Sequence, residues 1–188
     1  MYKADSFFPP FGEIKGGLER FAFFSIGSNL GDRMEHLRFA CKRMQEQIGV
    51  ICSISSVYET QPWGFVSANA FLNIALCIDT PLESHAIVQQ TQLIEQEAGR
   101  IASAGKNYID RVLDIDIVMH GQQIITDEQL TLPHPRMDTR KFVLIPLNEI
   151  APQLVHPILH KTIEELLMTC NDTGWVNLFK KKSLVVDN

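Results

Sequence analysis

Residues 111–119 have the sequence RVLDIDIVM, in which acidic and apolar residues alternate within a run of branched side chains. Successive side chains of a β-strand point to opposite faces, so Asp114 and Asp116 share one face of this predicted strand. The alternate apolar positions from Leu113 to Met119 share the other face, which we expect to be core. Aspartate is depleted in strands, so the acidic pair requires an explanation.

A divalent cation is one explanation for this pair. Carboxylates two residues apart on a strand lie roughly 6–7 Å apart at Cα and repel each other. Oxygen ligands of this kind suit Mg²⁺, which one or two carboxylates hold together with phosphate oxygens. The alternative is a half-exposed strand with solvated aspartates. We expect Asp114 and Asp116 to be metal ligands.

The composition limits the classes of partner. The chain has 188 residues and a formal net charge of −5, which argues against a nucleic-acid or membrane binder. We expect a loosely ordered extension at 1–20 and a single domain at 21–188. The four cysteines are widely scattered, which predicts reduced thiols in a soluble, monomeric, cytoplasmic protein.

The order of predicted elements indicates the fold class. In chain order we expect strand 21–26, helix 34–48, strand 50–58, strand 71–79, helix 81–98 and strand 111–119. This βαββαβ order matches a ferredoxin-like α+β core, an antiparallel sheet with helices packed on one face. C-terminal additions follow: a short strand at 124–125, a helical turn after 140–147 and a final helix from Thr162 with a capping signature.

Three polar features have more than one explanation. Asn73 shares a strand face with Phe71, and it either bonds neighbouring backbone or binds the polar edge of a planar ligand. Gln92 and Glu95 share a helix face, which is either solvated or part of a site. The turn at 27–31, GSNLG, either binds phosphate or lets Asn29 or Asp32 cap the next helix.

Seven motifs occur in a fixed order along the chain. They are GSNLG at 27–31, YET at 58–60, FLN at 71–73, QxxE at 92–95 with Gly99-Arg100, RxxDxD at 111–116, LPHPR at 132–136 and RxFVLxPL at 140–147. Together they resemble the 6-hydroxymethyl-7,8-dihydropterin pyrophosphokinase family over about residues 21–160.

The resemblance implies an activity and a set of site residues. The implied reaction transfers pyrophosphate from ATP to the hydroxymethyl group of 6-hydroxymethyl-7,8-dihydropterin, releasing AMP, in folate biosynthesis. Asp114 and Asp116 would hold two Mg²⁺ ions and would act in catalysis with Arg100 and Arg111. The implied ATP site is Gln92, Glu95, Arg100, Tyr108, Arg111, Ile117, Thr131, His134 and Arg140. The implied pterin site is Thr60, Gln61, Trp63, Phe71, Asn73 and Phe142.

The chain departs from the family pattern in two loops. Ile109-Asp110 stands where Gly-Pro is common before the arginine, and Tyr108 stands where tryptophan is common. Phe71 replaces a commoner tyrosine, and Trp63 replaces a smaller apolar residue. We therefore expect the loop geometry and the shape of the pterin pocket to differ from those of relatives.

Two other classes of protein fit parts of the sequence. A ferredoxin-like ligand or RNA module is one, but the acidic charge and the lack of interleaved aromatic and basic residues count against RNA. The other is a two-metal phosphohydrolase or nucleotidyltransferase built on the same aspartate pair. The nucleotide product distinguishes these from a pyrophosphokinase.

Overall fold

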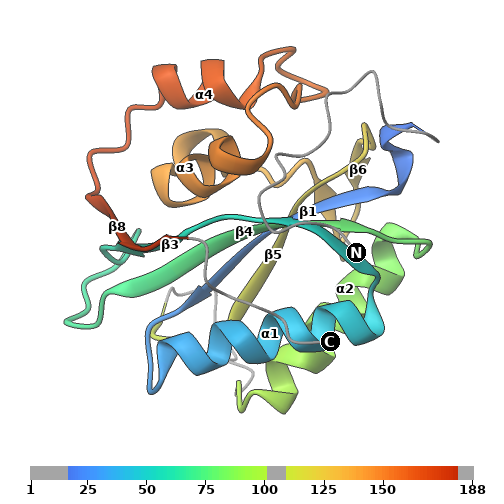
Figure 1. The fold of residues 1–188 in the computed structure, drawn as a ribbon. Helices are drawn as coiled ribbons and strands as arrows, with labels where there is room; N and C mark the ends of the chain where they lie inside the picture. The colour runs from blue at the N-terminus through green and yellow to red at the C-terminus, as the bar shows by residue number, and fades with distance from the viewer. Residues whose placement is uncertain (1–16, 101–108, 182–188) are drawn as a thin grey trace.

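The computed structural model describes residues 17–100 and 109–181 (Figure 1). The elements of the core are, in chain order, β1 (Phe21–Ser28), α1 (Arg33–Gln47), β2 (Val50–Ile54), β3 (Val57–Thr60), β4 (Phe71–Asp79), α2 (Ser84–Glu97) and β5 (Asp114–His120). After them come β6 (Ile125–Thr126), β7 (Thr131–Leu132), α3 (Lys141–Ile150), α4 (Ile163–Thr169) and β8 (Val176–Lys180), with 3₁₀ turns η2 (Leu18–Arg20) and η3 (Met137–Thr139).

A six-stranded antiparallel sheet forms the centre of the molecule. Its order is β5-β1-β4-β3-β8, with β2 also paired to β4, and β6 and β7 form a separate small sheet. The order β5-β1-β4-β2/β3 is that of a ferredoxin-like core, so the predicted α+β class is confirmed. The sequence did not predict β8, which adds an edge strand beside β3.

The single strand predicted at 50–58 is wrong in one respect, because two serines divide it into β2 and β3. Ser55 is held to β4 by its backbone N–H, which donates to the Ala75 carbonyl, and by its hydroxyl oxygen, which accepts from Ala75 N–H. Ser56 donates its N–H and its hydroxyl to the Glu149 carboxylate on α3, both at 2.9 Å. The break redirects β3 while leaving its backbone groups bonded.

Helices cover both faces of the sheet (Figure 1). α1 and α2 pack beneath it on a core that includes Phe24, Leu76 and Ile115. α3 and α4 pack above it on a second core that includes Phe23 and Leu147. The predicted arrangement with helices on one face describes α1 and α2, and the C-terminal additions cover the other face.

Local chemistry shifts some helix boundaries from those expected. α2 begins at Ser84 because the Thr80 hydroxyl donates to the Ile48 carbonyl and accepts from Leu82 N–H, which holds this segment in a turn. The expected capping box at Thr162 is present and starts α4. The sequence predicted only a helical turn after 140–147, whereas the ten-residue helix α3 already begins at Lys141 and continues through Pro146.

Met119 lies on the face opposite to the one predicted. The register between β1 and β5 shifts between Phe23 and Phe24, so Val118 has no partner in the ladder. A bulge of this kind moves the following side chain to the other face. Met119 therefore packs in the α3/α4 core, while Ile115 and Ile117 pack beneath the sheet as expected.

The predicted extension is described only in part. Its last three residues form η2, where Arg20 bridges to Asp79 at 2.9 Å, and residues 1–16 lie outside the described residues. Cys41 and Cys77 are buried, and all four cysteines are unpaired, in agreement with the predicted reduced thiols. In the described ranges the helices are too short or too polar to span a membrane.

Candidate active site

Three neighbouring strands bring Asp114, Gly27 and Asn73 into one row across the sheet. Gly27 of β1 pairs with Asn73 of β4 on one side and with Asp114 of β5 on the other. Directly opposed residues of antiparallel strands point to the same face, so Asp114 and Asn73 both point to the α3/α4 face. Asp116 belongs to the next row on this face, beside Ser25.

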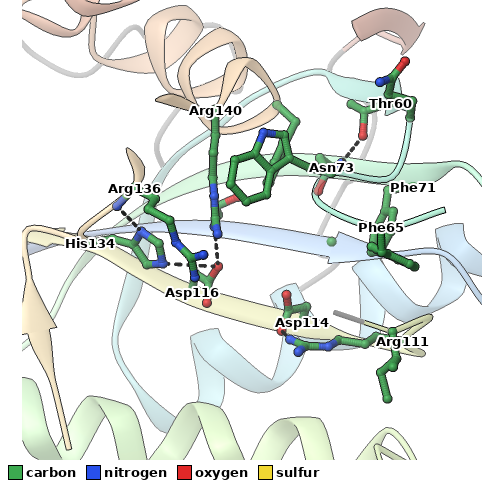
Figure 2. Close-up of a pocket in the computed structure, with 16 residues that line it drawn as sticks. Thr60, Phe65, Phe71, Asn73, Arg111, Asp114, Asp116, His134, Arg136 and Arg140 are labelled. Carbon is green, nitrogen blue, oxygen red and sulfur yellow. Dashed lines mark hydrogen bonds and ion pairs between the residues drawn. The ribbon is translucent and has the colours of Figure 1, made fainter. Parts of the chain in front are cut away.

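A cavity of about 470 Å³ lies over these rows. We call it the aromatic pocket. Its lining residues are Ser25, Gly27, Thr60, Gln61, Trp63, Phe65, Phe71, Asn73, Ile109, Arg111, Asp114, Asp116, His134, Arg136, Arg140 and Phe142. Figure 2 shows Asn73 and Phe71 on one side of it and the two aspartates on the other.

Small residues on β1 form the floor of the aromatic pocket. A Cβ atom at Gly27 would lie 2.6 Å from Asn73 Oδ1 and 3.4 Å from Phe71, so any larger residue would displace the amide. Asn73 is buried and donates through Nδ2 to Thr60 Oγ1 at 2.8 Å. The explanation that Asn73 bonds neighbouring backbone is therefore wrong, because its partner is a side chain, while the explanation that it binds the edge of a planar ligand stays a prediction. A fixed amide beside a thin floor fits a flat ligand with a polar edge.

Aromatic rings and guanidinium groups form the walls. Phe65 and Phe71 meet edge to face, with ring centroids 6.3 Å apart. The Arg140 guanidinium carbon lies 4.5 Å from the centre of the Trp63 ring and 5.6 Å from that of Phe142. Arg136 lies on Trp63 as well, at 5.7 Å. These are cation–π distances, so Trp63 gathers positive charge at the rim of the pocket.

A second cavity, of about 720 Å³, adjoins the first between α2, β5 and β7. We call it the charged pocket. Its lining residues are Val88, Thr91, Gln92, Glu95, Gln96, Arg100, Arg111, Asp114, Ile115, Asp116, Ile117, Gln129, Leu130, Thr131, His134 and Pro135.

Glu95 is the buried carboxylate of the charged pocket. It accepts the Ile115 N–H at 2.7 Å and forms an ion pair with Arg100, which also reaches Asp114 at 3.2 Å. Burial raises the pKa of Glu95 to about 7, and the nearby charge of Asp114 adds to this while Arg100 opposes it. Gln92 is exposed on the same helix. The solvated-face explanation is wrong for Glu95, whereas Gln92 is both exposed and part of the lining of the charged pocket.

The two pockets share Arg111, Asp114, Asp116 and His134. Arg111 lies in the loop before β5 and forms an ion pair with Asp114. Arg140 and His134 approach Asp116 from the other end, at 3.8 and 3.9 Å (Figure 2). The aspartates are therefore accessible to ligands in both cavities.

His134 is neutral in this setting. Burial and the charges of Arg140 and Arg136 lower its pKa to about 4. Its Nδ1 accepts the Arg136 backbone N–H at 3.2 Å, which leaves the proton of the neutral ring on Nε2. Nε2 is the atom that faces Asp116, so His134 offers a neutral N–H donor at the junction of the pockets.

The aspartate pair fits a Mg²⁺ site that substrate oxygens complete. Burial and the charge of Asp114 raise the pKa of Asp116 to about 7, while the charges of Arg140, Arg111 and Arg100 oppose the shift. A divalent cation between the carboxylates would relieve this repulsion. Within 17–100 and 109–181, groups of three or more acidic, His or Cys ligands are absent. Two carboxylates alone leave most of the Mg²⁺ coordination positions for water or phosphate.

The structure distributes the predicted site residues between the pockets. The predicted pterin residues Thr60, Gln61, Trp63, Phe71, Asn73 and Phe142 all line the aromatic pocket. Of the predicted ATP residues, Gln92, Glu95, Arg100, Arg111, Ile117, Thr131 and His134 line the charged pocket. Arg140 lines the aromatic pocket and approaches the charged one only through Asp116. Tyr108 lies outside the described residues.

Sequence reasoning missed five residues of the aromatic pocket: Ser25, Gly27, Phe65, Ile109 and Arg136. Ser25 and Gly27 are small residues at alternate positions of an apolar strand, a pattern that marks a close approach to one face. Phe65 lies in an irregular loop, where no periodicity predicts its direction. Arg136 lies in the motif at 132–136, but its position beside Trp63 depends on tertiary contacts.

Fold and site together define a class: small-molecule group-transfer enzymes with two adjoining pockets on a ferredoxin-like sheet. The chain belongs to the 7,8-dihydro-6-hydroxymethylpterin-pyrophosphokinase (HPPK) family, whose model matches residues 23–152.

Two relatives support this assignment at the level of sequence. The 2-amino-4-hydroxy-6-hydroxymethyldihydropteridine pyrophosphokinase of Porphyromonas gingivalis is 43% identical over 137 residues, which cover 72% of this chain and 92% of that protein. The enzyme of the same name from Bacillus subtilis is 39% identical over 167 residues, which cover 88% and 94% of the two chains.

A solved structure supports the fold. Wild-type Plasmodium falciparum HPPK-DHPS with pterin and p-hydroxybenzoate matches 79% of this chain with a TM-score of 0.63 and 17% identity. The match covers 42% of that longer chain, so this protein corresponds to less than half of it. At this identity the likeness shows a shared fold alone.

Proposed function

We propose that this chain is a Mg²⁺-dependent pyrophosphokinase. It transfers the terminal pyrophosphoryl group of ATP to the hydroxymethyl oxygen of 6-hydroxymethyl-7,8-dihydropterin, releasing AMP, in folate biosynthesis. The hydroxymethyl oxygen forms a bond to the β-phosphorus, and the bond from that phosphorus to the oxygen bridging the α-phosphate breaks. The hydroxyl proton is released to the medium.

The observation that supports this proposal is the junction of two unlike pockets at one aspartate pair. The aromatic pocket suits a planar heterocycle, because rings flank it and Asn73 and Thr60 offer polar groups at its edge. The charged pocket suits a triphosphate, because Arg100, Arg111 and His134 supply N–H donors. A ligand in each cavity would meet the other at the aspartates.

The residues of the chain would bind, orient and neutralise charge. Asp114 and Asp116 would hold Mg²⁺, which when bound neutralises phosphate charge and makes the β-phosphorus more electrophilic. Arg100 and Arg111 are now paired with carboxylates and would move to phosphate oxygens. His134 would donate a hydrogen bond from its Nε2–H to a further phosphate oxygen. Positioning and charge neutralisation supply most of the catalysis in phosphoryl-group transfer.

The form of the active enzyme is part of the proposal. We propose a monomer as the catalytic unit, with both pockets formed by residues of one chain. We propose a cytoplasmic location, since the substrate ATP is available there.

The test is the identity of the products from γ-labelled ATP and the reduced pterin. We expect AMP and a diphosphorylated pterin in equal amounts, with the label in the pterin product and no AMP when the pterin is omitted. ADP as the main nucleotide would indicate transfer of one phosphoryl group. Pyrophosphate or phosphate as the main product would indicate a nucleotidyltransferase or a hydrolase. Any of these three results would contradict the proposal.

A further inference from the structure

Asp110 lies where three separate loops meet. It precedes Arg111, and its two carboxylate oxygens accept from different segments. Oδ1 accepts from the Asn29 side-chain amide at 2.7 Å, and Oδ2 accepts from the Asn69 side-chain amide at 2.9 Å. Asn29 follows β1, whereas Asn69 ends the loop that carries Trp63.

Asn29 holds the arginine side of this junction. Its backbone N–H donates to the Arg111 carbonyl at 3.0 Å, and its side-chain oxygen accepts the Arg111 N–H at 2.6 Å. Asn29 is 3% exposed, so these bonds are shielded from water. They fix the backbone of the arginine that pairs with Asp114, and they form without Asp110.

Two residues hold the pterin side: Asn29, whose Nδ2 also donates to the Asn69 backbone carbonyl at 3.2 Å, and Asp110. The Ser67 hydroxyl bonds the same carboxylate, and Asn69 N–H in turn donates to Ser67 Oγ at 3.0 Å. Arg33 anchors the next residue by donating to the Ala70 carbonyl at 2.8 Å. The chain then enters β4 at Phe71, which lines the aromatic pocket.

We propose that Asp110 is a positioning residue that couples the aromatic pocket to the charged pocket, by tying the loop of residues 61–70 to the backbone of Arg111. When a triphosphate binds Arg111, the hydrogen bonds of Asp110 favour the conformation of residues 61–70 that binds the pterin. The tie works equally in the other direction, because coupling between two sites is reciprocal. This inference deepens the proposed function and rests on it.

Charge and chemistry support this role. Hydrogen bonds from Ser67, Asn29 and Asn69 hold the pKa of Asp110 below its usual value, so the carboxylate is ionised at neutral pH. An ionised carboxylate is the one side chain that accepts from all three donors at once.

The experiment measures pterin binding to the full chain with and without an ATP analogue. The probe is the reduced pterin, titrated by calorimetry in Mg²⁺ with and without the α,β-methylene analogue. The ratio of the two pterin dissociation constants reports the coupling. We expect Asp110→Ala to reduce this ratio about tenfold, the effect of losing charge-assisted hydrogen bonds. Affinity for the analogue alone should stay within about threefold, since Asn29 still holds Arg111.

Two comparisons separate positioning from general stability. Asn69→Ala should reproduce the loss, and the double variant should lose no more than either single one. Asp110→Asn keeps one acceptor oxygen and should fall between wild type and Asp110→Ala. Glu165→Ala is the matched control, since it removes a carboxylate that accepts a backbone N–H from Thr162 on α4, away from both pockets. It should lower the melting temperature and leave the coupling ratio unchanged.

The proposal is overturned if Asp110→Ala keeps the wild-type ratio, if the Asn69 and Asp110 effects add, or if Glu165→Ala lowers the ratio equally. It is also overturned if wild type forms AMP with no nucleotide-dependent gain in pterin affinity. That last result leaves the proposed function intact. Failure of wild type to form AMP and pterin diphosphate would instead reject the function.

Discussion

The two pockets differ in how they are built, although they share four residues. The aromatic pocket combines neutral surfaces with charged groups at its rim: its floor is backbone and small side chains of β1, its polar edge is an amide already bonded to Thr60, and its arginines Arg136 and Arg140 lie on the Trp63 ring. In the charged pocket, carboxylates and guanidinium groups are paired with one another. A ligand binds in the aromatic pocket by filling its space, whereas an anion binds in the charged pocket by replacing the carboxylates as partners of the arginines.

This difference predicts two kinds of response. When an arginine of the charged pocket leaves a carboxylate for a phosphate oxygen, one ion pair replaces another. The free-energy cost of the exchange is therefore small, and the charged pocket is suited to a highly charged nucleotide. The aromatic pocket needs shape complementarity, so small steric changes there should act on one ligand alone. Variants at the shared aspartates should affect both pockets.

The largest effect is expected at the shared pair. Asp116→Asn removes a carboxylate accessible from both cavities and should lower kcat about 10²–10³-fold in Mg²⁺. Circular dichroism and the melting temperature should show an intact fold, since the lost carboxylate repels Asp114. Near-full kcat would contradict the proposed metal role, and global unfolding would show that Asp116 is structural.

A smaller, one-sided effect is expected at Gly27. Gly27→Ala places a Cβ 2.6 Å from Asn73 Oδ1, so the amide must move. The KM for the pterin should rise about tenfold, the effect of one displaced polar contact, with the KM for ATP unchanged. The matched test is the Asn73→Ala background, where the clash is absent and Gly27→Ala should cost nothing further. Equal changes in both KM values would show that the pockets are not separable.

A spectroscopic response is expected from Trp63. The chain has two tryptophans. Trp63 lines the aromatic pocket beside Arg140, while Trp175 is 42% exposed and lines neither pocket. Pterin binding should change Trp63 emission, and more so with an ATP analogue and Mg²⁺ present. After correction for pterin absorption, the response should persist in Trp175→Phe and vanish in Trp63→Phe. The reverse pattern would place the pterin elsewhere.

The smallest effect concerns the stability of the metal-free protein. The pKa of Asp116 is raised from 3.8 to about 7 in the fold, so the folded state retains a proton that the unfolded chain releases between these values. This contribution to stability is present in full below about pH 4 and is lost as the pH rises through 7.

In EDTA, Asp116→Asn should therefore gain in free energy of unfolding, relative to wild type, as the pH rises from 5 to 8. We expect a gain of about 1 kcal/mol, because the carboxylate is 36% exposed and water screens the repulsion. Urea titrations at several pH values measure it. A difference that is independent of pH would contradict the raised pKa.

Periodicity predicted those parts of the fold that depend on local pattern. Alternation along β4 and β5 placed Asn73, Asp114 and Asp116 on the site face, because the side-chain period of a strand survives packing. It failed at Met119, where a bulge resets the alternation. It also missed the edge strand β8, whose residues are mostly exposed.

Prediction of the site depended on the motifs, and it stopped where long-range contacts begin. The residues predicted for the pterin line the aromatic pocket, and most of those predicted for ATP line the charged pocket. No local pattern indicates that Asp110 meets Asn69, 41 positions away in sequence, or that Arg136 lies on Trp63. The burial of Glu95 was missed for the same reason, since its partner Ile115 belongs to a strand 20 residues later.

We propose that both ligands contact the Mg²⁺ ions held by Asp114 and Asp116. Nuclear relaxation with Mn²⁺ in place of Mg²⁺ tests it directly, in the complex with the α,β-methylene ATP analogue and the reduced pterin. We predict strong broadening of the pterin hydroxymethyl protons, dependent on the nucleotide and lost in Asp116→Asn. Broadening confined to the nucleotide, with sharp pterin resonances in a saturated ternary complex, would contradict it.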